Sequence, residues 1–268
     1  MELNHKYENL NKIEVQIKFL TKSEIRLRIL NCLKKKPSSI KDIVEETKLT
    51  YSSISSNMAK LYKKEYIYKS SGKYYINPIC NIYLKNLLEF DQLIKLIGEF
   101  KTFWGKHILN EININSLREI TDLNESELIE STPIDIYKPH NHMKNLISNS
   151  NEIKAIFPFL HPDYPKIIEN LLEKNSKIEI IIPKSIESQL FENMDKNIVK
   201  EGIKNKKLKV KIIKENINLS LVINKYHMSL GLFKIDGSYD QNRLLTSKTP
   251  EAIAWASNLF IKINNTVF

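Results

Sequence analysis

The sequence of 268 residues has few cysteines, few glycines and no long apolar run. Its two cysteines, Cys32 and Cys80, are too few for a disulfide framework or a four-ligand zinc site, and both fit a reducing compartment. No stretch of about 18 uncharged apolar residues occurs, and the N-terminus lacks the apolar core of a secretory signal. We therefore expect a cytoplasmic protein without a membrane span.

Signatures of catalysis and of cofactor binding are also missing. With six glycines in all, the chain contains no G-x-G-x-x-G, P-loop or G-x-S-x-G element. Asp236, Gly237 and Asp240 fit a β-turn better than a calcium loop, because the bidentate glutamate that such a loop needs later on is absent. The sequence therefore predicts no enzyme activity, no catalytic residue and no cofactor.

The histidines give little support for a metal site. His140-x-His142 is a close pair, but it lies beside Pro139 in a predicted loop without a cysteine or carboxylate at a matching local spacing. His107, near Trp104, is expected to be a packed, hydrogen-bonded residue. We therefore expect no bound metal.

Positive charge is concentrated at the start of the chain. The formal net charge is +10. Residues 1–85 hold 17 Lys+Arg and 8 Asp+Glu, which gives +9, whereas residues 86–268 hold 24 and 23, which gives +1. A lysine-rich composition alone does not explain why acidic residues balance the lysines only in the second part. A basic excess confined to one small segment is typical of a module that binds a polyanion.

The first 78 residues show helical periodicity followed by a hairpin pattern. Residues 6–20 fit either a helix or a strand. Helices are predicted over residues 24–35, 40–47 and 51–64. A hydroxyl that can cap the helix precedes each one: Ser23, Ser39 and Thr50. Residues 66–69 and 74–76 flank a glycine-containing turn and predict a β-hairpin. This order of elements predicts a winged helix-turn-helix DNA-binding domain over residues 1–78.

The third predicted helix would enter the major groove of DNA, where base edges can be read. If Ile54, Met58 and Leu61 face inward, the polar side chains of this helix face the duplex. Lysines near the hairpin tip would meet the phosphate backbone. The predicted DNA-binding residues are Thr50, Ser52, Ser53, Ser56, Asn57, Lys60, Lys69 and Lys73. A charged, solvated helical subdomain without a nucleic-acid role stays open as an alternative. Winged-helix folds also serve as protein-interaction modules, so the fold alone does not establish DNA binding.

The rest of the chain is predicted to form a connector and a second domain. Residues 79–108 fit a connector helix or a dimerisation helix. The following ranges are predicted as strands: 154–158, 178–182, 208–213, 219–223, 228–233 and 243–245. Helices are predicted over 163–174, 186–205 and 250–264. Alternation of strands and helices predicts βαβ units. We therefore expect residues 109–268 to form an α/β domain whose largely parallel sheet is flanked by helices.

Two residues of this second domain are candidate effector ligands. Thr246 and Ser247 lie between a predicted strand and the helix that begins at Pro250. Strand ends that lead into helix N-termini favour anions. The same residues also fit a helix cap, and that alternative stays open.

Several motifs resemble those of archaeal FilR-type transcriptional regulators, a methanogenesis-regulatory family. The stretch LTKSEIRLRIL, residues 20–30, is similar to the start of the winged-helix head of that family. The second-domain motifs that carry the resemblance are Phe103-Trp104-x-x-His107, Gly231-Leu232-Phe233-x-x-Asp236-Gly237-x-x-Asp240 and Trp255-x-x-x-Leu259-Phe260. The likeness covers about residues 20–262, and its motifs are apolar and aromatic rather than catalytic.

The resemblance implies a promoter-binding transcription factor that acts as a homodimer. It also implies that the second domain is related to the phospholipase D-like fold. Catalytic phospholipases of that fold carry a His-x-Lys pattern. We interpret the pattern as absent here, because Ser229 stands where lysine would be needed after His227. The resemblance therefore supports an inherited fold without the hydrolase chemistry.

We expect a sequence-specific transcriptional regulator that binds double-stranded promoter DNA as a homodimer. Its second domain would sense a small-molecule effector or assemble the dimer. Two alternatives stay open at this point. One is a phospholipase D-like phosphodiesterase or nuclease targeted by the winged helix, and the other is a non-enzymatic architectural or protein-interaction module.

Overall fold

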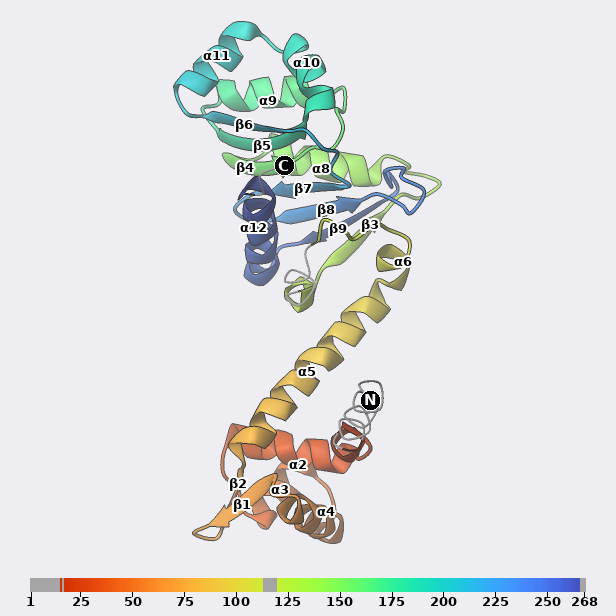
Figure 1. Ribbon diagram of the computed structural model, residues 1–268, viewed down its shortest axis with the longest axis vertical. Coiled ribbons are helices and arrows are strands. Elements are labelled where there is room, and N and C mark those ends of the chain that lie inside the picture. Colours follow the sequence, from red (N-terminus) through yellow and green to blue (C-terminus); the bar gives the residue numbers. More distant parts are fainter. Residues whose placement is uncertain (1–14, 16, 113–119, 266–268) are drawn as a thin grey trace, which may run out of the picture. The chain divides into compact units, whose positions relative to one another are not determined.

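The computed structural model describes residues 15, 17–112 and 120–265 of the chain (Figure 1). Contacts divide the chain into two units, Met1–Asp91 and Gln92–Phe268. The boundary falls inside the long helix α5 (Pro78–Glu99), so the segment predicted as a connector is shared between the units. The predicted domain limits at residues 78 and 108 stay predictions.

The first unit contains helices and a hairpin in the order that the sequence predicts. Its elements are α2 (Glu24–Lys35), α3 (Ile40–Thr47), α4 (Tyr51–Lys63), β1 (Ile67–Ser70) and β2 (Lys73–Ile76). Each helix begins after the predicted hydroxyl, which accepts a hydrogen bond from a backbone N–H of the first turn. Ahead of them, residues 17–21 are helical, and most of the ambiguous segment 6–20 lies outside the described residues.

The hairpin is closed by a turn that suits its sequence. Ser70 pairs with Lys73, which leaves a two-residue loop of Ser71 and Gly72. Both loop residues have positive φ, 46° and 78°. Two-residue loops with positive φ match the twist of the flanking strands, and glycine adopts this conformation without a steric penalty.

One apolar core joins the helices of the first unit. Ile29, Ile43, Ile54 and Leu61 are fully buried in it and come from three successive helices. From α5, Leu84 enters the same core. Burying an aliphatic side chain of this size contributes about 1.5–3 kcal/mol, so this small unit depends on each of them.

The second unit is built on one seven-stranded sheet with the order β3-β9-β8-β7-β4-β5-β6. The strands are β3 (Glu127–Glu130), β4 (Glu152–Ile156), β5 (Lys177–Pro183), β6 (Leu208–Ile213), β7 (Leu219–Ile223), β8 (Met228–Leu232) and β9 (Arg243–Ser247). Two pairings are parallel, β4 with β5 and β5 with β6. The other pairings are antiparallel, including that of β4 with β7.

The prediction of a largely parallel sheet is therefore wrong, and the sheet is mixed. The βαβ spacing holds only for β4, β5 and β6. Short connections join β7 to β8, and such connections can link only antiparallel neighbours. The edge strand β3 was not predicted at all.

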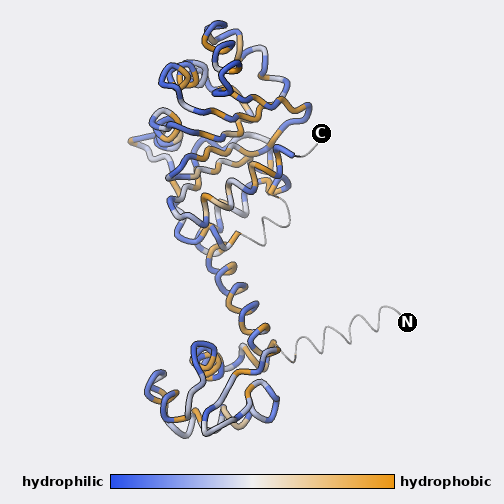
Figure 2. The backbone as a smooth tube through the Cα atoms, turned by 90° about the vertical axis from the view of Figure 1, so that its left-hand side faces the viewer, coloured by the Kyte–Doolittle hydropathy of each residue, from blue (hydrophilic) through white to orange (hydrophobic). Residues whose placement is uncertain are grey.

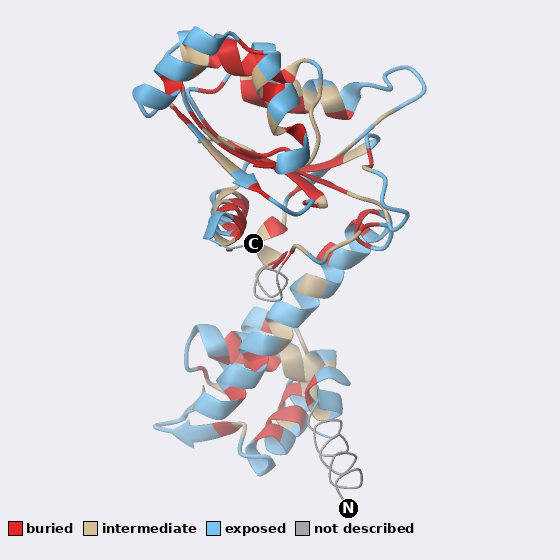
Figure 3. Cartoon of the chain, turned by 45° about the horizontal axis from the view of Figure 1, so that its top comes forward, coloured by how far each residue is buried: buried red, intermediate tan, exposed pale blue. Residues whose placement is uncertain are grey.

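Helices cover both faces of this sheet. One face carries α12 (Pro250–Asn265), the short α6 (Lys101–Trp104) and the 3₁₀ turn over Ile120–Leu123, and the other carries α8 (Lys138–Ser148), α9 (Tyr164–Glu173) and α10 (Lys184–Glu192). Along β5, Ile180 and Ile182 point to the second face and Ile181 to the first. Figure 2 shows the strands as mostly hydrophobic, and Figure 3 shows them as mostly buried.

Two predicted helices and one predicted loop differ in the structure. The connector helix predicted over residues 79–108 ends at Glu99 and is followed by α6. The helix expected over 186–205 is two helices, α10 and α11 (Lys196–Lys204), because Asp195 caps the second one through the N–H groups of Asn197 and Ile198. The remaining correction concerns the segment around His140, which was predicted as a loop and lies in α8. Pro139 suggested a loop, but proline is well tolerated in the first turn of a helix.

Candidate functional site

Helix α4 presents a polar face to solvent. At about 100° per residue, Ala59, Ser52, Lys63, Ser56 and Lys60 follow one another over an arc of roughly 100°. All of these residues are exposed, whereas Ile54, Met58 and Leu61 on the opposite face are buried as predicted. The exposed face carries hydroxyl and ammonium groups, which can bond to base edges and phosphates. Lys63 was not among the predicted residues, although helical periodicity places it between Ser52 and Ser56.

Three of the predicted DNA-binding residues have roles inside the helix. The exposed fraction of Asn57 is 9%, and its Nδ2 donates to the Ser53 carbonyl at 2.8 Å. Ser53 is half-buried. Thr50 caps α4, because its Oγ1 accepts a hydrogen bond from the Ser53 N–H at 3.4 Å. The expectation that Asn57 lies on the outward face with Ser56 and Lys60 is therefore wrong.

The hairpin adds positive charge beside this helix. Lys69 and Lys73 are exposed, and the Lys69 Nζ lies 5.4 Å from the centroid of the Tyr74 ring. Across the hairpin, the rings of Tyr68 and Tyr75 stack with centroids 5.2 Å apart. Within the described part of the chain, no carboxylate lies within ion-pair distance of Lys60 or Lys69. Their charge is therefore left for an external anion.

The predicted effector residues Thr246 and Ser247 are buried at the end of β9. Thr246 Oγ1 donates to the Met228 carbonyl at 2.8 Å. Ser247 Oγ accepts from the Thr249 N–H at 3.3 Å, and Thr249 in turn caps α12. The capping residue of α12 is therefore Thr249 and not Thr246 or Ser247, and an effector role for these two residues stays a prediction.

One His-x-Lys pair does occur, contrary to the interpretation above, and it lies on α8. His142 Nε2 lies 3.2 Å from Thr246 Oγ1, while Lys144 Nζ donates to Asp163 Oδ2 at 2.7 Å. Residues i and i+2 share a face in a strand but not in a helix. The two side chains therefore point to different neighbours and do not form the paired site of a phosphodiesterase.

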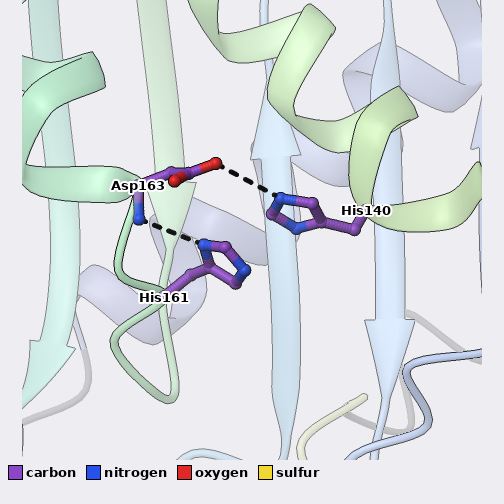
Figure 4. A group of neighbouring side chains, drawn as sticks. All are labelled: His140, His161 and Asp163. Carbon is purple, nitrogen blue, oxygen red and sulfur yellow. Dashed lines mark hydrogen bonds and ion pairs between the residues drawn. The ribbon is translucent and has the colours of Figure 1, made fainter. Parts of the chain in front are cut away.

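A second group of polar residues lies between α8 and the loop that precedes α9 (Figure 4). His140 Nε2 lies 3.6 Å from Asp163 Oδ2, and the imidazole rings of His140 and His161 stack with centroids 3.9 Å apart. The group borders a cavity of about 180 Å³. The cavity lining consists of Tyr137, Pro139, His140, Met143, Phe159, His161, Tyr164, Tyr239, Gln241, Arg243 and Leu244.

Charge and burial set the protonation of this group. The hydrogen bond from the Lys144 ammonium holds the pKa of the Asp163 carboxyl below its usual range. Burial, and then the neighbouring His140, lowers the pKa of His161. At neutral pH this arrangement favours an ionised carboxylate beside an uncharged imidazole of His161. Sequence reasoning missed the cluster, because its members are about twenty residues apart and α8 was predicted as a loop.

Two protein-family models together match most of the chain. The model for the N-terminal domain of the methanogenesis regulatory protein FilR1 matches residues 14–97, and the model for the middle domain of that protein matches residues 136–266. The chain belongs to the FilR1 family of methanogenesis regulatory proteins. The family resemblance predicted from the sequence is thereby confirmed, and the FilR1 family is named for a regulatory protein.

Sequence identity and coverage can be stated for one curated member of the FilR1 family. The chain is 23% identical over 251 residues to the methanogenesis regulatory protein FilR1 of Methanothrix harundinacea (strain 6Ac). The match spans 91% of this chain but only 56% of that protein, so the chain corresponds to little more than half of its relative.

Solved structures are more distant. TrmBL2, described as an archaeal chromatin protein with a novel mode of DNA binding, has a TM-score of 0.41 and 14% identity over 88% of this chain and 90% of that one. The dimethyltransferase RosA from Streptomyces davawensis has a TM-score of 0.25 and 8% identity, over 80% and 67%. Neither TM-score reaches the range in which a shared fold is established. Among the described residues, no helix is long and apolar enough to span a membrane.

Proposed function

We propose that this FilR1-family chain is a sequence-specific transcriptional regulator whose first unit is a winged helix-turn-helix that binds double-stranded DNA. The observation that carries the proposal is the exposed polar face of α4, with Lys60 and Lys63, beside the lysine-bearing hairpin. Helix α4 would lie in the major groove, with Ser52 and Ser56 toward the base edges. The hairpin would contact the phosphate backbone through Lys69 and Lys73.

We further propose that the regulator acts as a homodimer through α5. Exposed apolar side chains on this helix are Ile79, Ile82, Tyr83, Phe90, Ile94 and Ile97. At about 100° per residue they fall within an arc of roughly 120°, the width of an apolar helix face. A second copy of α5 would cover this stripe. Dimerisation would set two half-sites about 34–36 Å apart on DNA, or a multiple of that distance.

The second unit is then the part that senses an effector or assembles the dimer. Support comes from its separate core and from the cavity beside His140 and His161, since small-molecule sites are concave and largely apolar. A relationship of this unit to the phospholipase D-like fold stays a prediction of the resemblance.

Fluorescence anisotropy with a labelled duplex from the promoter of the chain's own gene tests the proposal. The association constant should fall steeply between about 50 and 200 mM salt, because phosphate neutralisation releases counterions. The triple variant Lys60→Ala, Lys63→Ala, Lys69→Ala should bind more weakly, and its log–log salt slope should be smaller by about 3.

A matched control removes the same charge elsewhere. Lys196, Lys200 and Lys204 are exposed on α11 in the second unit, and their triple alanine variant should bind like the native protein. Equal losses in both triple variants, or equal affinity of the native protein for an unrelated duplex, would count against sequence-specific binding by α4.

A further inference from the structure

His140, His161 and Asp163 come together from two segments that are separate in the sequence. His140 lies in the first turn of α8, and the other two residues lie in the loop between β4 and α9 (Figure 4). One ligand atom from each of the three side chains lies within 4.8 Å of the others. All three side chains are partly exposed, so an ion can reach them from solvent.

We propose that His140, His161 and Asp163 bind a divalent transition-metal ion such as Zn²⁺ or Co²⁺. Imidazole nitrogens and a carboxylate oxygen are the ligands that zinc and its first-row neighbours take in proteins. Calcium and magnesium prefer sites made of oxygen atoms, which two histidines do not provide. Three protein ligands leave coordination positions open, and a site of this kind binds water or a further small ligand.

The open coordination positions of the ion would face the cavity beside the cluster. His140 and His161 are themselves part of its lining, together with Tyr239 and Arg243 from the region of β9. The cavity volume of about 180 Å³ admits several water molecules or one small ligand. The ion would therefore bind at the wall of a cavity rather than on an open surface.

The ammonium group of Lys144 competes with a metal ion for the Asp163 carboxylate. Its Nζ lies 2.7 Å from Asp163 Oδ2, so a metal ion must displace this ammonium from the carboxylate and then tolerate its positive charge. The exposed fraction of the Lys144 side chain is 43%, which lets the ammonium move into solvent. Removing this charge should therefore strengthen metal binding.

Isothermal titration of the full chain with Zn²⁺, and absorption spectra of its Co²⁺ complex, test the site. We expect about one ion per chain and d–d bands typical of low-coordinate Co²⁺. Asp163→Asn, and the pair His140→Ala with His161→Ala, should weaken binding by about a hundredfold or more. Asp163→Asn is nearly isosteric and lies at a partly exposed position, so it keeps the test valid if the double variant fails to fold.

Two further variants separate the cluster from general histidine or charge effects. His227→Ala removes a histidine elsewhere in the same unit and should leave Zn²⁺ affinity unchanged, whereas Lys144→Met should raise it. The proposal is overturned if the native chain binds no stoichiometric Zn²⁺. It is also overturned if Asp163→Asn binds as well as the native chain, or if His227→Ala loses as much affinity as the double variant.

Discussion

His107 and Asp240 form a buried pair, with His107 Nε2 3.0 Å from Asp240 Oδ2, although 133 residues separate them in the sequence. The other ring nitrogen of His107, Nδ1, is hydrogen-bonded to the Phe103 carbonyl. Phe103 and His107 belong to one of the motifs that carry the family resemblance, and Asp240 ends another. The pair therefore brings two motifs that are far apart in the sequence into contact in the folded chain.

The first prediction concerns the stability that this pair provides. His107→Ala should lower the free energy of unfolding by about 2–4 kcal/mol, because it leaves the buried Asp240 carboxylate without its partner. Urea unfolding followed by circular dichroism measures the change. In a double-mutant cycle with Asp240→Asn, the two losses should be strongly non-additive. Strict additivity would show that the two side chains do not stabilise each other.

The second prediction distinguishes a residue that stabilises α4 from a residue that contacts DNA. Asn57→Ala should lower the free energy of unfolding by about 1 kcal/mol, since it removes a partly buried hydrogen bond to the Ser53 carbonyl. At temperatures where the variant is folded, its preference among DNA sequences should be unchanged. Ser56→Ala should keep the native free energy of unfolding, because Ser56 is exposed. It should instead alter the affinity for particular base pairs. A change of sequence preference in Asn57→Ala would contradict this division.

Local signals in the sequence were sufficient for the first unit. Ser23, Ser39 and Thr50 mark the helix starts correctly, because an N-cap depends only on the residues that immediately follow it. The exposed face of α4 was predicted in part: Ser52, Ser56 and Lys60 are exposed as expected, Lys63 was missed, and Asn57 is buried. Asn57 lies at the edge of the helix face, where its amide bonds back to the preceding turn instead of pointing to solvent.

The second unit depends on contacts that no local pattern contains. The antiparallel pairing of β4 with β7 joins strands about seventy residues apart, so the spacing of β4, β5 and β6 suggested parallel neighbours throughout. The cluster at His140 and Asp163 is non-local in the same way. Its first member was also hidden by Pro139, which suggested a loop although it lies in the first turn of α8.

The third prediction tests the apolar stripe on α5. Phe90 and Ile94 are exposed to 58% and 53%, and a glutamate at either position would place a charge inside a dimer seam. The native protein should elute with a light-scattering mass of twice 31.4 kDa, and Phe90→Glu with Ile94→Glu should reduce it to 31.4 kDa. Gln92→Glu, an exposed position off the stripe, is the control and should stay dimeric. A native monomer would contradict the proposed dimer.

The fourth prediction concerns pH and the start of α3. Hydrogen bonds from the Ser39 N–H and hydroxyl hold the pKa of Asp42 below its usual range. A carboxyl with a lowered pKa stabilises the folded state at pH values above its unfolded pKa, and this contribution is lost as pH falls below about 4. Asp42→Asn should therefore unfold at a lower temperature at neutral pH, and the gap to the native protein should narrow in acid. A gap that stays constant down to low pH would exclude this role.

The fifth prediction concerns the two thiols. Burial, together with the Glu46 carboxylate that accepts a hydrogen bond from Cys32 Sγ at 3.2 Å, raises the pKa of Cys32 to about 11. Burial alone raises the pKa of Cys80 to about 11. Because the thiolate is the reactive form, both thiols should react with a disulfide reagent at pH 8 about a hundredfold more slowly in native protein than in urea. Glu46→Gln should accelerate the reaction of the Cys32 thiol but not that of the Cys80 thiol. Peptide mass spectrometry distinguishes the two sites. Equal rates in native and unfolded protein would mean that neither thiol is protected by the core.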